Sequence, residues 1–207
     1  MMAAPSVLLY PGAGSDSDHP RLVEIEEELG QSARVARHDF PYRKEGSKGP
    51  PDRASKLMAS IRDDLAKVAR RRSPLVVGGH SMGGRLASTG AADVDGEGRV
   101  KNLAGLVLLA YPLHPPRKLG KLRVEHFPDV TVPCLFISGT RDDFGTPDEL
   151  EHWTTTITGP VEHVWLDAAR HDLKGCNAEI ATQVAAFVAR VTASRRHEGA
   201  EIFNSMR

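Results

Sequence analysis

The chain has 207 residues, 40% of them hydrophobic, and its 27 lysines and arginines balance its 27 aspartates and glutamates. This length predicts one domain with one full-sized core over residues 1–195, followed by a polar tail at 196–207 that we expect to be disordered. The net charge of zero argues against nucleic acid or an anionic membrane as a partner.

The N-terminal half alternates between short apolar runs, typical of strands, and segments with apolar residues at helical spacing. We predict strands at Ser6–Tyr10, Ala33–His38 and Leu75–Gly79, and helices at His19–Gly30, Asp52–Arg71 and Gly83–Ala92. Asp52 is the expected N-cap of its helix. Asp39–Pro51 is rich in proline, glycine and charge, and it is predicted to be a loop.

The C-terminal half continues the same alternation. Its continuous apolar runs suit strands that are covered on both faces, as in parallel sheets. We predict strands at Leu103–Ala110, Val132–Ser138 and Val161–Leu166, and helices at Pro147–Ile157 and Asn177–Val191. The whole pattern indicates an α/β domain with a mainly parallel sheet and helices on both faces. In such sheets the ligand site lies at the carboxyl ends of the strands.

The strongest catalytic signal is the run GGHSMGG at positions 78–84, which contains the pattern G-x-S-x-G. With a strand before it and a helix after it, Ser81 is expected on a sharp turn that exposes its hydroxyl as a nucleophile. Glycines two positions before and after leave room for close backbone approach, and the helix N-terminus favours developing negative charge. His80 is expected to line the pocket rather than act as the base. A glycine-rich turn with an incidental serine is the alternative that this context disfavours.

A serine nucleophile needs a base, and the base needs an orienting acid. With this motif the order along the chain is serine, then an acid, then histidine. Asp142 and Asp143 follow the fifth predicted strand, and His171 follows the sixth. We assign Asp142 as the acid and His171 as the base. Asp143 stays open as an alternative acid, although it is expected to cap the turn toward Thr146.

The run YPGAG at positions 10–14 follows the first strand and predicts an oxyanion hole. Backbone N–H groups there would stabilise the negative charge of a tetrahedral intermediate. One donor is expected from Met82, and the other from Ala13 or Gly14. Gly12 and Gly14 are also expected to line the pocket. Phosphate binding is the alternative, but neither G-x-G-x-x-G nor a Walker lysine is present.

Read together, these motifs resemble the α/β-hydrolase superfamily. The closest resemblance is to its small, lidless bacterial branch, near dienelactone-hydrolase-like proteins. That branch is related to the hydrolase-like domain of a eukaryotic histone-acetyltransferase complex subunit and to a testis-expressed protein. The motifs that carry the resemblance are YPGAGSDSD, GGHSMGGRLAS, AYPLHPPRK with a following LRVEHF, PCLFISGTRDDFGT and ARHDLKG.

The resemblance implies Ser81, Asp142 and His171 as the catalytic triad, with Ala13 and Met82 as oxyanion donors. Compared with that superfamily, we expect the sheet to begin at the oxyanion-loop strand, without the two strands that usually precede it. The resemblance therefore implies a minimal fold, a three-layer sandwich of about six parallel strands in the order 2-1-3-4-5-6. Dienelactone hydrolase itself has a cysteine nucleophile where this chain has serine, and Tyr10 stands where a histidine is usual.

The segment after the fourth strand is predicted to form part of the substrate pocket. Tyr111 and His114 should line it, and the interval up to Thr131 is too short for a helical lid. An open pocket suits small or flexible acyl groups. Four basic residues in this interval could bind a carboxylate or phosphate, or could simply face solvent. They are Arg117, Lys118, Lys121 and Arg123.

The sequence thus predicts a serine hydrolase that cleaves a small ester or thioester through an acyl-enzyme, with a small acyl compound as substrate. Two other hypotheses stay open: a catalytically quiet interaction scaffold, and a peptidase or carbon–carbon bond hydrolase that uses the same triad. No cofactor is expected, and no histidine pair has the spacing of metal ligands. Two cysteines and an N-terminus without a signal-peptide pattern predict a cytoplasmic protein.

Overall fold

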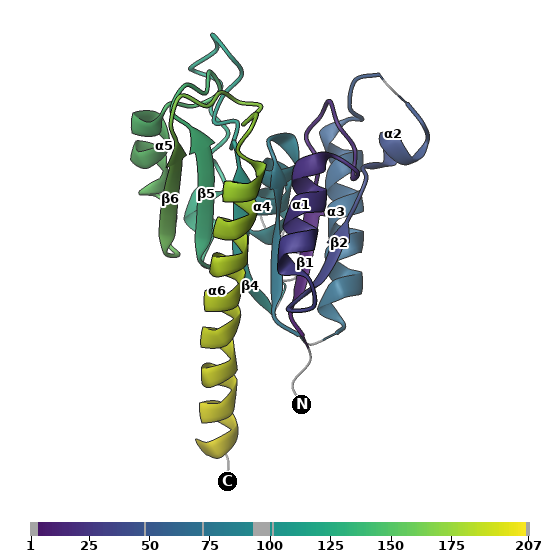
Figure 1. Cartoon of the computed structure of the whole chain (residues 1–207), viewed down its shortest axis with the longest axis vertical. Helices are drawn as coiled ribbons and strands as arrows, with labels where there is room; N and C mark the ends of the chain where they lie inside the picture. The colour runs from purple at the N-terminus through teal and green to yellow at the C-terminus, as the bar shows by residue number, and fades with distance from the viewer. Residues whose placement is uncertain (1–3, 48, 72, 93–99, 101, 206–207) are drawn as a thin grey trace.

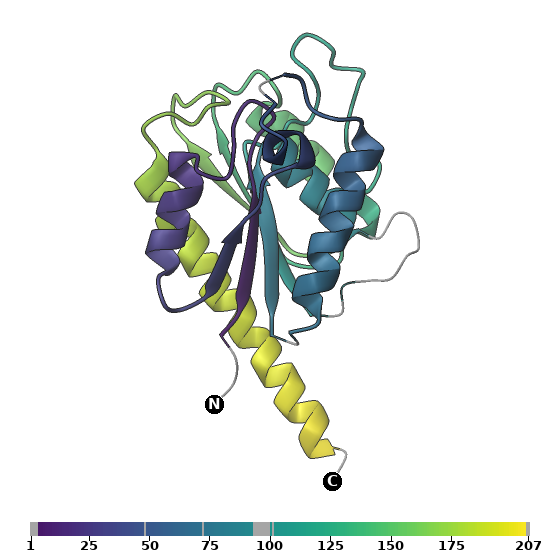
Figure 2. The same ribbon diagram turned by 90° about the vertical axis from the view of Figure 1, so that its right-hand side faces the viewer.

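A computed structural model of the chain describes residues 4–47, 49–71, 73–92, 100 and 102–205, with side chains up to residue 193. In this part of the chain the strands form one parallel sheet with helices on both faces (Figure 1, Figure 2). The sheet has six strands in the order β2-β1-β3-β4-β5-β6, which confirms the predicted fold and strand order. All carboxyl ends of the strands therefore lie along one edge of the sheet.

The strands follow the predicted apolar runs closely. Their bounds are β1 Ser6–Tyr10, β2 Arg34–Arg37, β3 Leu75–His80, β4 Leu103–Leu109, β5 Cys134–Gly139 and β6 Val161–Leu166. All seven residues of β4 are buried, as expected for a strand in the middle of the sheet with helices on both sides. In β2, at one edge, none of the four residues is fully buried.

The helices also match, with changes at their ends. Their bounds are α1 Pro20–Leu29, α2 Pro41–Lys44, α3 Ala54–Ala69, α4 Met82–Ala91, α5 Pro147–Thr154 and α6 Asn177–Ser205. The short helix α2 lies within the predicted loop, because Pro41 supplies the backbone angle that a first helical residue needs. The predicted cap Asp52 is wrong: Arg53 is the N-cap residue of α3. Asp52 instead accepts a hydrogen bond from Lys56.

The last helix is longer than the sequence pattern predicts. The amphipathic pattern ends at Val191, but α6 continues to Ser205 and projects beyond the sheet (Figure 1). The added segment contains no proline, the residue that most strongly disfavours the interior of a helix. Most of the tail expected to be disordered is therefore helical in the structure, while residues 206–207 lie outside the described residues. The division at residue 195 stays a prediction.

Two hydrophobic cores lie on the two faces of the sheet, and alternate strand residues point into each. In β1, Leu8 and Tyr10 face the core under α3, α4 and α5, while Val7 and Leu9 face the core under α1 and α6. The sheet is therefore buried between two layers of helices. Among the described residues, no helix is both long and apolar enough to cross a membrane.

Phe187 tests how α6 is held on the sheet. Its ring is buried against β4, where a Cβ added to Gly105 would lie only 3.0 Å from it. We expect Phe187→Ala to lower the free energy of unfolding by about 3–5 kcal/mol in urea denaturation, because it leaves a cavity in a closely packed layer. The exposed Gln183 on the same helix provides the control. Gln183→Ala should change stability by less than about 0.5 kcal/mol, and equal losses in both variants would contradict this packing.

Candidate active site

The turn between β3 and α4 holds Ser81 in a strained backbone conformation. Its φ of 50° and ψ of −115° lie in a region that residues with a side chain seldom adopt. The turn is fixed at both ends, since Ser81 N donates to Leu109 O at 2.8 Å and Arg85 N donates to Ser81 O at 3.0 Å. The serine therefore sits at the N-terminus of α4, as the G-x-S-x-G pattern predicts.

The glycines flanking this turn let it lie against the end of β1. A Cβ at Gly79 would lie 2.1 Å from Tyr10 O, and a Cβ at Gly83 would lie 2.5 Å from the same atom. Both distances are far below van der Waals contact. The small residues at these positions therefore bring the serine turn beside the loop that follows β1, as expected from the sequence.

Three predicted residues come together through hydrogen bonds. Ser81 Oγ lies 2.8 Å from His171 Nε2, and His171 Nδ1 lies 2.9 Å from Asp142 Oδ2 and 3.0 Å from Asp142 Oδ1. A carboxylate accepts hydrogen bonds, so Nδ1 carries the proton and Nε2 is free to accept the hydroxyl proton of Ser81. Asp142 is buried and His171 is partly exposed. This is the geometry that nucleophilic activation of a serine requires.

Of the two neighbouring aspartates, only Asp142 contacts His171 in the structure. Asp142 points inward to His171, whereas Asp143 is exposed. The expected capping role of Asp143 is wrong, because Thr146 itself caps α5. The Thr146 side chain accepts from Glu149 N, and Glu149 Oε2 accepts from Thr146 N, so the two residues form a capping box.

Phe144 is a site residue that sequence reasoning missed. Its ring stacks on the His171 imidazole with ring centroids 3.8 Å apart, and its N–H donates to Asp142 Oδ1 at 2.8 Å. The aromatic ring thus fixes the face of the imidazole, and the backbone amide fixes the carboxylate. The only sequence signal for this role is an aromatic residue two positions after the acid.

A buried arginine on α1 holds the loop that carries the histidine. Arg21 Nη2 donates to the carbonyl oxygens of Asp172 at 2.5 Å and Leu173 at 2.9 Å, directly after His171. Burial lowers the pKa of Arg21. The sequence pattern places Arg21 in a helix but gives no reason to link it to a loop 151 positions away.

His80 lies in the pocket beside the serine, as expected. Its Nε2–H donates to the carbonyl oxygen of His171 at 3.1 Å. Burial, with a further contribution from the nearby charge of Arg21, lowers the pKa of His80 to about 3. His80 is therefore neutral at physiological pH and braces the histidine loop without adding charge to the pocket.

The expected oxyanion loop is anchored by side chains of the short helix α2. Ala13 O accepts hydrogen bonds from the Tyr42 hydroxyl at 2.9 Å and from Arg43 Nη2 at 3.1 Å, both on α2. Gly12 O accepts from Ser15 N at 3.2 Å. These bonds fix the loop while leaving the Ala13 N–H outside the clamp. Because α2 was expected to be loop, this anchor was missed.

Tyr10 takes no part in the pocket. Its ring is buried and stacks on Phe40, and its hydroxyl donates to Asp64 Oδ2 at 3.3 Å. Asp64 also lies 2.8 Å from His38 Nδ1, and this contact, against the opposing effect of burial, lowers the pKa of the carboxyl. The tyrosine found where a histidine is usual is therefore a core residue, and Tyr42 and Arg43 of α2 hold the loop after β1.

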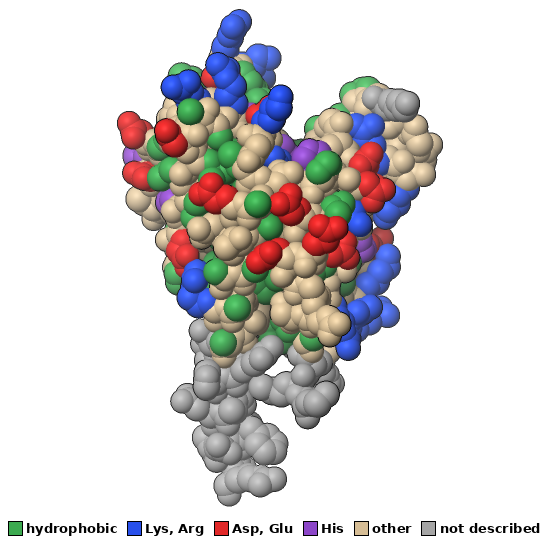
Figure 3. Space-filling view, viewed as in Figure 1, with side chains coloured by type: hydrophobic (Ala, Val, Ile, Leu, Met, Phe, Trp, Pro, Cys, Tyr) green, Lys and Arg blue, Asp and Glu red, His purple; other side chains and the backbone are tan. Residues whose placement is uncertain are grey.

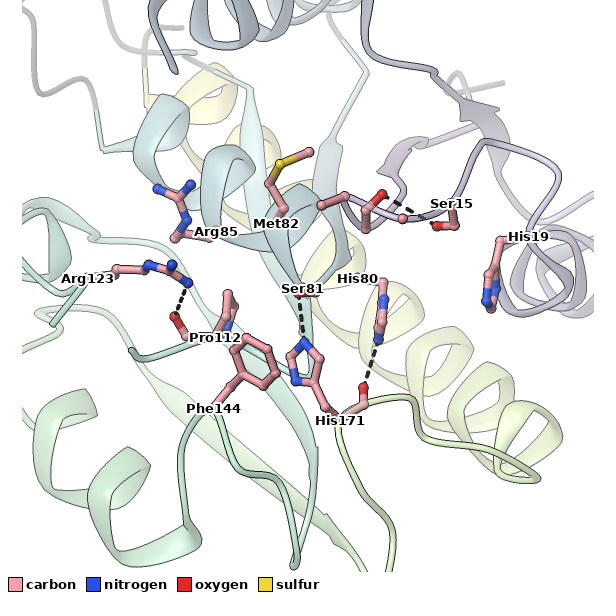
Figure 4. Close-up of a pocket in the computed structure, with 13 residues that line it drawn as sticks. Ser15, His19, His80, Ser81, Met82, Arg85, Pro112, Arg123, Phe144 and His171 are labelled. Carbon is pink, nitrogen blue, oxygen red and sulfur yellow. Dashed lines mark hydrogen bonds between the residues drawn. The ribbon is translucent and has the colours of Figure 1, made fainter. Parts of the chain in front are cut away.

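A pocket of about 460 Å³ opens at the carboxyl edge of the sheet and contains Ser81 and His171. Figure 3 shows histidine side chains in a hollow at the top of the molecule, and Figure 4 shows the serine and histidine facing each other inside the pocket. The other residues that line it are Gly12, Ala13, Gly14, Ser15, His19, His80, Met82, Arg85, Pro112, Arg123 and Phe144.

Two predicted pocket residues are placed elsewhere. Tyr111 is buried in the core, with its ring between Phe127 and Phe136 and its hydroxyl donating to Arg123 O at 2.6 Å. His114 is buried against Glu149 and Pro115 O. The physical reason is the turn after β4, where Ala110 adopts a φ of 46° and redirects the chain. Only Pro112 of this stretch lines the pocket.

The basic interval after β4 divides into two groups. Arg117, Lys118 and Lys121 are exposed and do not line the pocket, as the solvent-facing alternative expects. Arg123 is partly buried, lines the pocket and donates to Pro112 O at 3.2 Å. Between residues 111 and 131 the only helix is the single 3₁₀ turn Phe127–Asp129, so no helical lid is present. No three potential metal ligands converge within the described residues.

The chain is similar to known proteins in both sequence and structure. Residues 3–197 match the model of a family described as an alpha/beta hydrolase domain. The structure is similar to Est1E from Butyrivibrio proteoclasticus, with a TM-score of 0.72, 14% identity, and coverage of 92% of this chain and 89% of Est1E. It is also similar to the RedJ thioesterase of the prodiginine pathway in Streptomyces coelicolor, with a TM-score of 0.69, 18% identity, and coverage of 89% and 86%.

A third similar structure is an alpha-beta serine hydrolase homologue from Coxiella burnetii. It has a TM-score of 0.66, 17% identity, and coverage of 90% of this chain and 84% of the homologue. At these identities the structural likeness shows a shared fold, and the residues of the site have to be argued from their own geometry.

The close contact at Gly83 can be tested with a matched glycine. We expect Gly83→Ala to lower the free energy of unfolding by about 2 kcal/mol in urea denaturation, because its Cβ would overlap Tyr10 O and Pro11 O at 2.5 Å. Gly14, four residues along the chain from Tyr10, has open space around its Cβ position. Gly14→Ala should therefore change stability by less than about 0.5 kcal/mol. A stable Gly83→Ala protein would contradict the packing of the serine turn on β1.

Proposed function

Because the chain belongs to the alpha/beta hydrolase domain family, we propose that it is a serine hydrolase that cleaves a small ester or thioester. The observation that carries this proposal is the 2.8 Å contact between Ser81 Oγ and His171 Nε2, with Asp142 on the other ring nitrogen. The motifs also favour a place in the dienelactone-hydrolase-like branch, which stays a prediction. A cytoplasmic location likewise stays a prediction, in keeping with the free thiols of Cys134 and Cys176.

The proposed reaction has two halves. Ser81 Oγ attacks the substrate carbonyl carbon while its proton passes to His171 Nε2, and Asp142 stabilises the resulting imidazolium. The tetrahedral intermediate collapses, and the alcohol or thiol leaves with the proton from His171. Water then attacks the acyl-enzyme, giving its proton to His171. The second collapse releases the carboxylic acid and returns the proton to Ser81.

Negative charge on the tetrahedral oxygen needs fixed donors. The N–H groups of Met82 and Ala13 are the proposed donors, and the N-terminus of α4 adds its partial positive charge. The clamp of Tyr42 and Arg43 on Ala13 O supports this assignment, because it holds the loop before substrate arrives. Donors fixed in advance need no reorganisation during the reaction.

A second serine–histidine pair, Ser88 and His126, has the same hydrogen bond as Ser81 and His171 but lies outside the pocket. Ser88 Oγ and His126 Nε2 also lie 2.8 Å apart, but both residues are buried away from the pocket. Burial, and the nearby charge of Arg85, lower the pKa of His126 to about 4. No carboxylate contacts this histidine among the described residues. Ser88 therefore serves as the matched control for Ser81.

Labelling with a small fluorophosphonate tests the proposal. We expect one adduct on the wild-type protein by intact mass, because His171 activates the Ser81 hydroxyl. The adduct should be absent in Ser81→Ala and present in Ser88→Ala. Short acyl esters should then be hydrolysed by the wild type and not by Ser81→Ala. A folded wild type that takes no label would favour the interaction scaffold instead.

The two aspartates give a further test. We expect Asp142→Asn to lower kcat/KM on a short ester by about 10³–10⁴-fold, because an amide no longer fixes the histidine tautomer. Asp143→Asn should lie within about threefold of the wild type, since the Asp143 side chain is exposed and outside the pocket. Similar losses in both variants would show that the assignment of the acid is wrong.

A further inference from the structure

Two arginines stand together on one wall of the pocket. Arg85, on α4, and Arg123, from the segment after β4, both line the pocket that contains Ser81. Both also line a second pocket of about 280 Å³, so the two pockets share these arginines. Figure 4 shows them on the same side of Ser81, with His80 and His19 on the other side.

These arginines lack the carboxylate partners that other basic residues have. Arg37, for example, pairs with Glu26 at 2.6 Å and with Asp18 at 2.9 Å. Within the described residues, no ion pair involves Arg85 or Arg123, and Arg85 Nε is buried without a hydrogen-bond partner. A partly buried charge without an opposite charge beside it lowers the stability of the protein. Two like charges close together lower it further.

The electrostatics of this wall agree with the geometry. Burial lowers the pKa of Arg123, and the charge of Arg85 lowers it further. Glu125 lines the second pocket but not the pocket of Ser81, and its side chain is exposed. In the described part of the chain, the two arginines of this wall therefore form no ion pair with a neighbouring carboxylate.

The position of Arg85 ties this charge to the reacting centre. Arg85 is one helical turn from the serine, its backbone N–H donates to Ser81 O at 3.0 Å, and it lines the pocket that contains Ser81. A guanidinium group offers several N–H donors in a planar fork that matches a carboxylate or a phosphate. A small substrate bound at Ser81 could thus reach this wall with a second functional group.

We propose that the pocket selects acyl substrates that carry a second, anionic group, such as a carboxylate, and that Arg85 and Arg123 bind that group. The inference rests on the proposed hydrolase function for the position of the ester bond. It specifies the substrate class: a half-ester or half-thioester of a short dicarboxylic acid, or an ester whose leaving group is anionic. Neutral esters of equal length would carry no negative charge to pair with Arg85 and Arg123.

The first experiment compares hydrolysis of two pairs of esters by the intact protein. In the first pair, mono-4-nitrophenyl glutarate carries a carboxylate on the acyl side, and 4-nitrophenyl pentanoate is its neutral reference. In the second pair, 4-acetoxybenzoate carries a carboxylate on the leaving group, and phenyl acetate is its neutral reference. We expect one of the two anionic esters to exceed its reference in kcat/KM by about 10–100-fold, the range for a hydrogen bond between charged groups. Which ester is favoured identifies the side that carries the anion.

Variants locate the effect. Arg85→Gln and Arg123→Gln should each reduce the ratio of anionic to neutral kcat/KM by about tenfold or more. Lys121→Gln is the matched control, because Lys121 is close to Arg123 in the chain, exposed and outside the pocket. Its ratio should stay within about twofold of the wild type. Equal ratios for wild type and the two arginine variants would overturn the inference.

Binding to Ser81→Ala separates this inference from the proposed function. By titration calorimetry, the favoured anionic ester should bind at least tenfold more tightly than its neutral reference, and Arg123→Gln in the same background should remove the difference. Charge-selective binding without turnover in the wild type would retain the inference and overturn the hydrolase function. Turnover of neutral and anionic esters alike, with no selectivity in binding, would do the reverse.

Discussion

The candidate site is arranged around the strained backbone of one residue, Ser81. A residue with φ of 50° in the turn from β3 to α4 costs roughly 1–3 kcal/mol and persists only where its surroundings enforce it. The enforcing contacts come from β4 through Leu109 O and from β1 through the close approach of Gly79 and Gly83. The same contacts that impose the strain also seat the serine beside the loop after β1. The packing of β1, β3 and β4 therefore produces both the strained backbone of Ser81 and its position.

The partners of the serine are held by elements far from them in sequence. Arg21 of α1 fixes the loop that carries the histidine, and α2 fixes the loop after β1 through Tyr42 and Arg43. Each clamp acts on backbone carbonyl oxygens and leaves the reacting groups free. In a parallel sheet all site loops leave the same edge, so such lateral bonds are needed to hold loops that have no regular structure of their own.

The sequence was sufficient for the strand order of the sheet and for Ser81, Asp142 and His171, which the structure joins by hydrogen bonds. Buried parallel strands read as apolar runs, and the G-x-S-x-G pattern indicates its own turn. The direction of side chains after a strand could not be read in this way: Tyr111 and His114 turn away from the pocket because Ala110 changes the course of the chain. Phe144 joins the site by stacking on His171, a contact that the sequence pattern does not reveal, and Arg85 lines the pocket one helical turn after Ser81.

The connectivity of the strands also determines when the site forms during folding. The nucleophile turn belongs to the central strands β1, β3 and β4, while His171 follows β6 at the edge, 90 positions after Ser81. Contacts between distant parts of a chain form late, and synthesis delivers the N-terminal strands first. We therefore expect a nascent or truncated chain to carry the strained serine without its histidine partner. The hydrogen bond between Ser81 and His171 can form only once β6 has docked on the sheet.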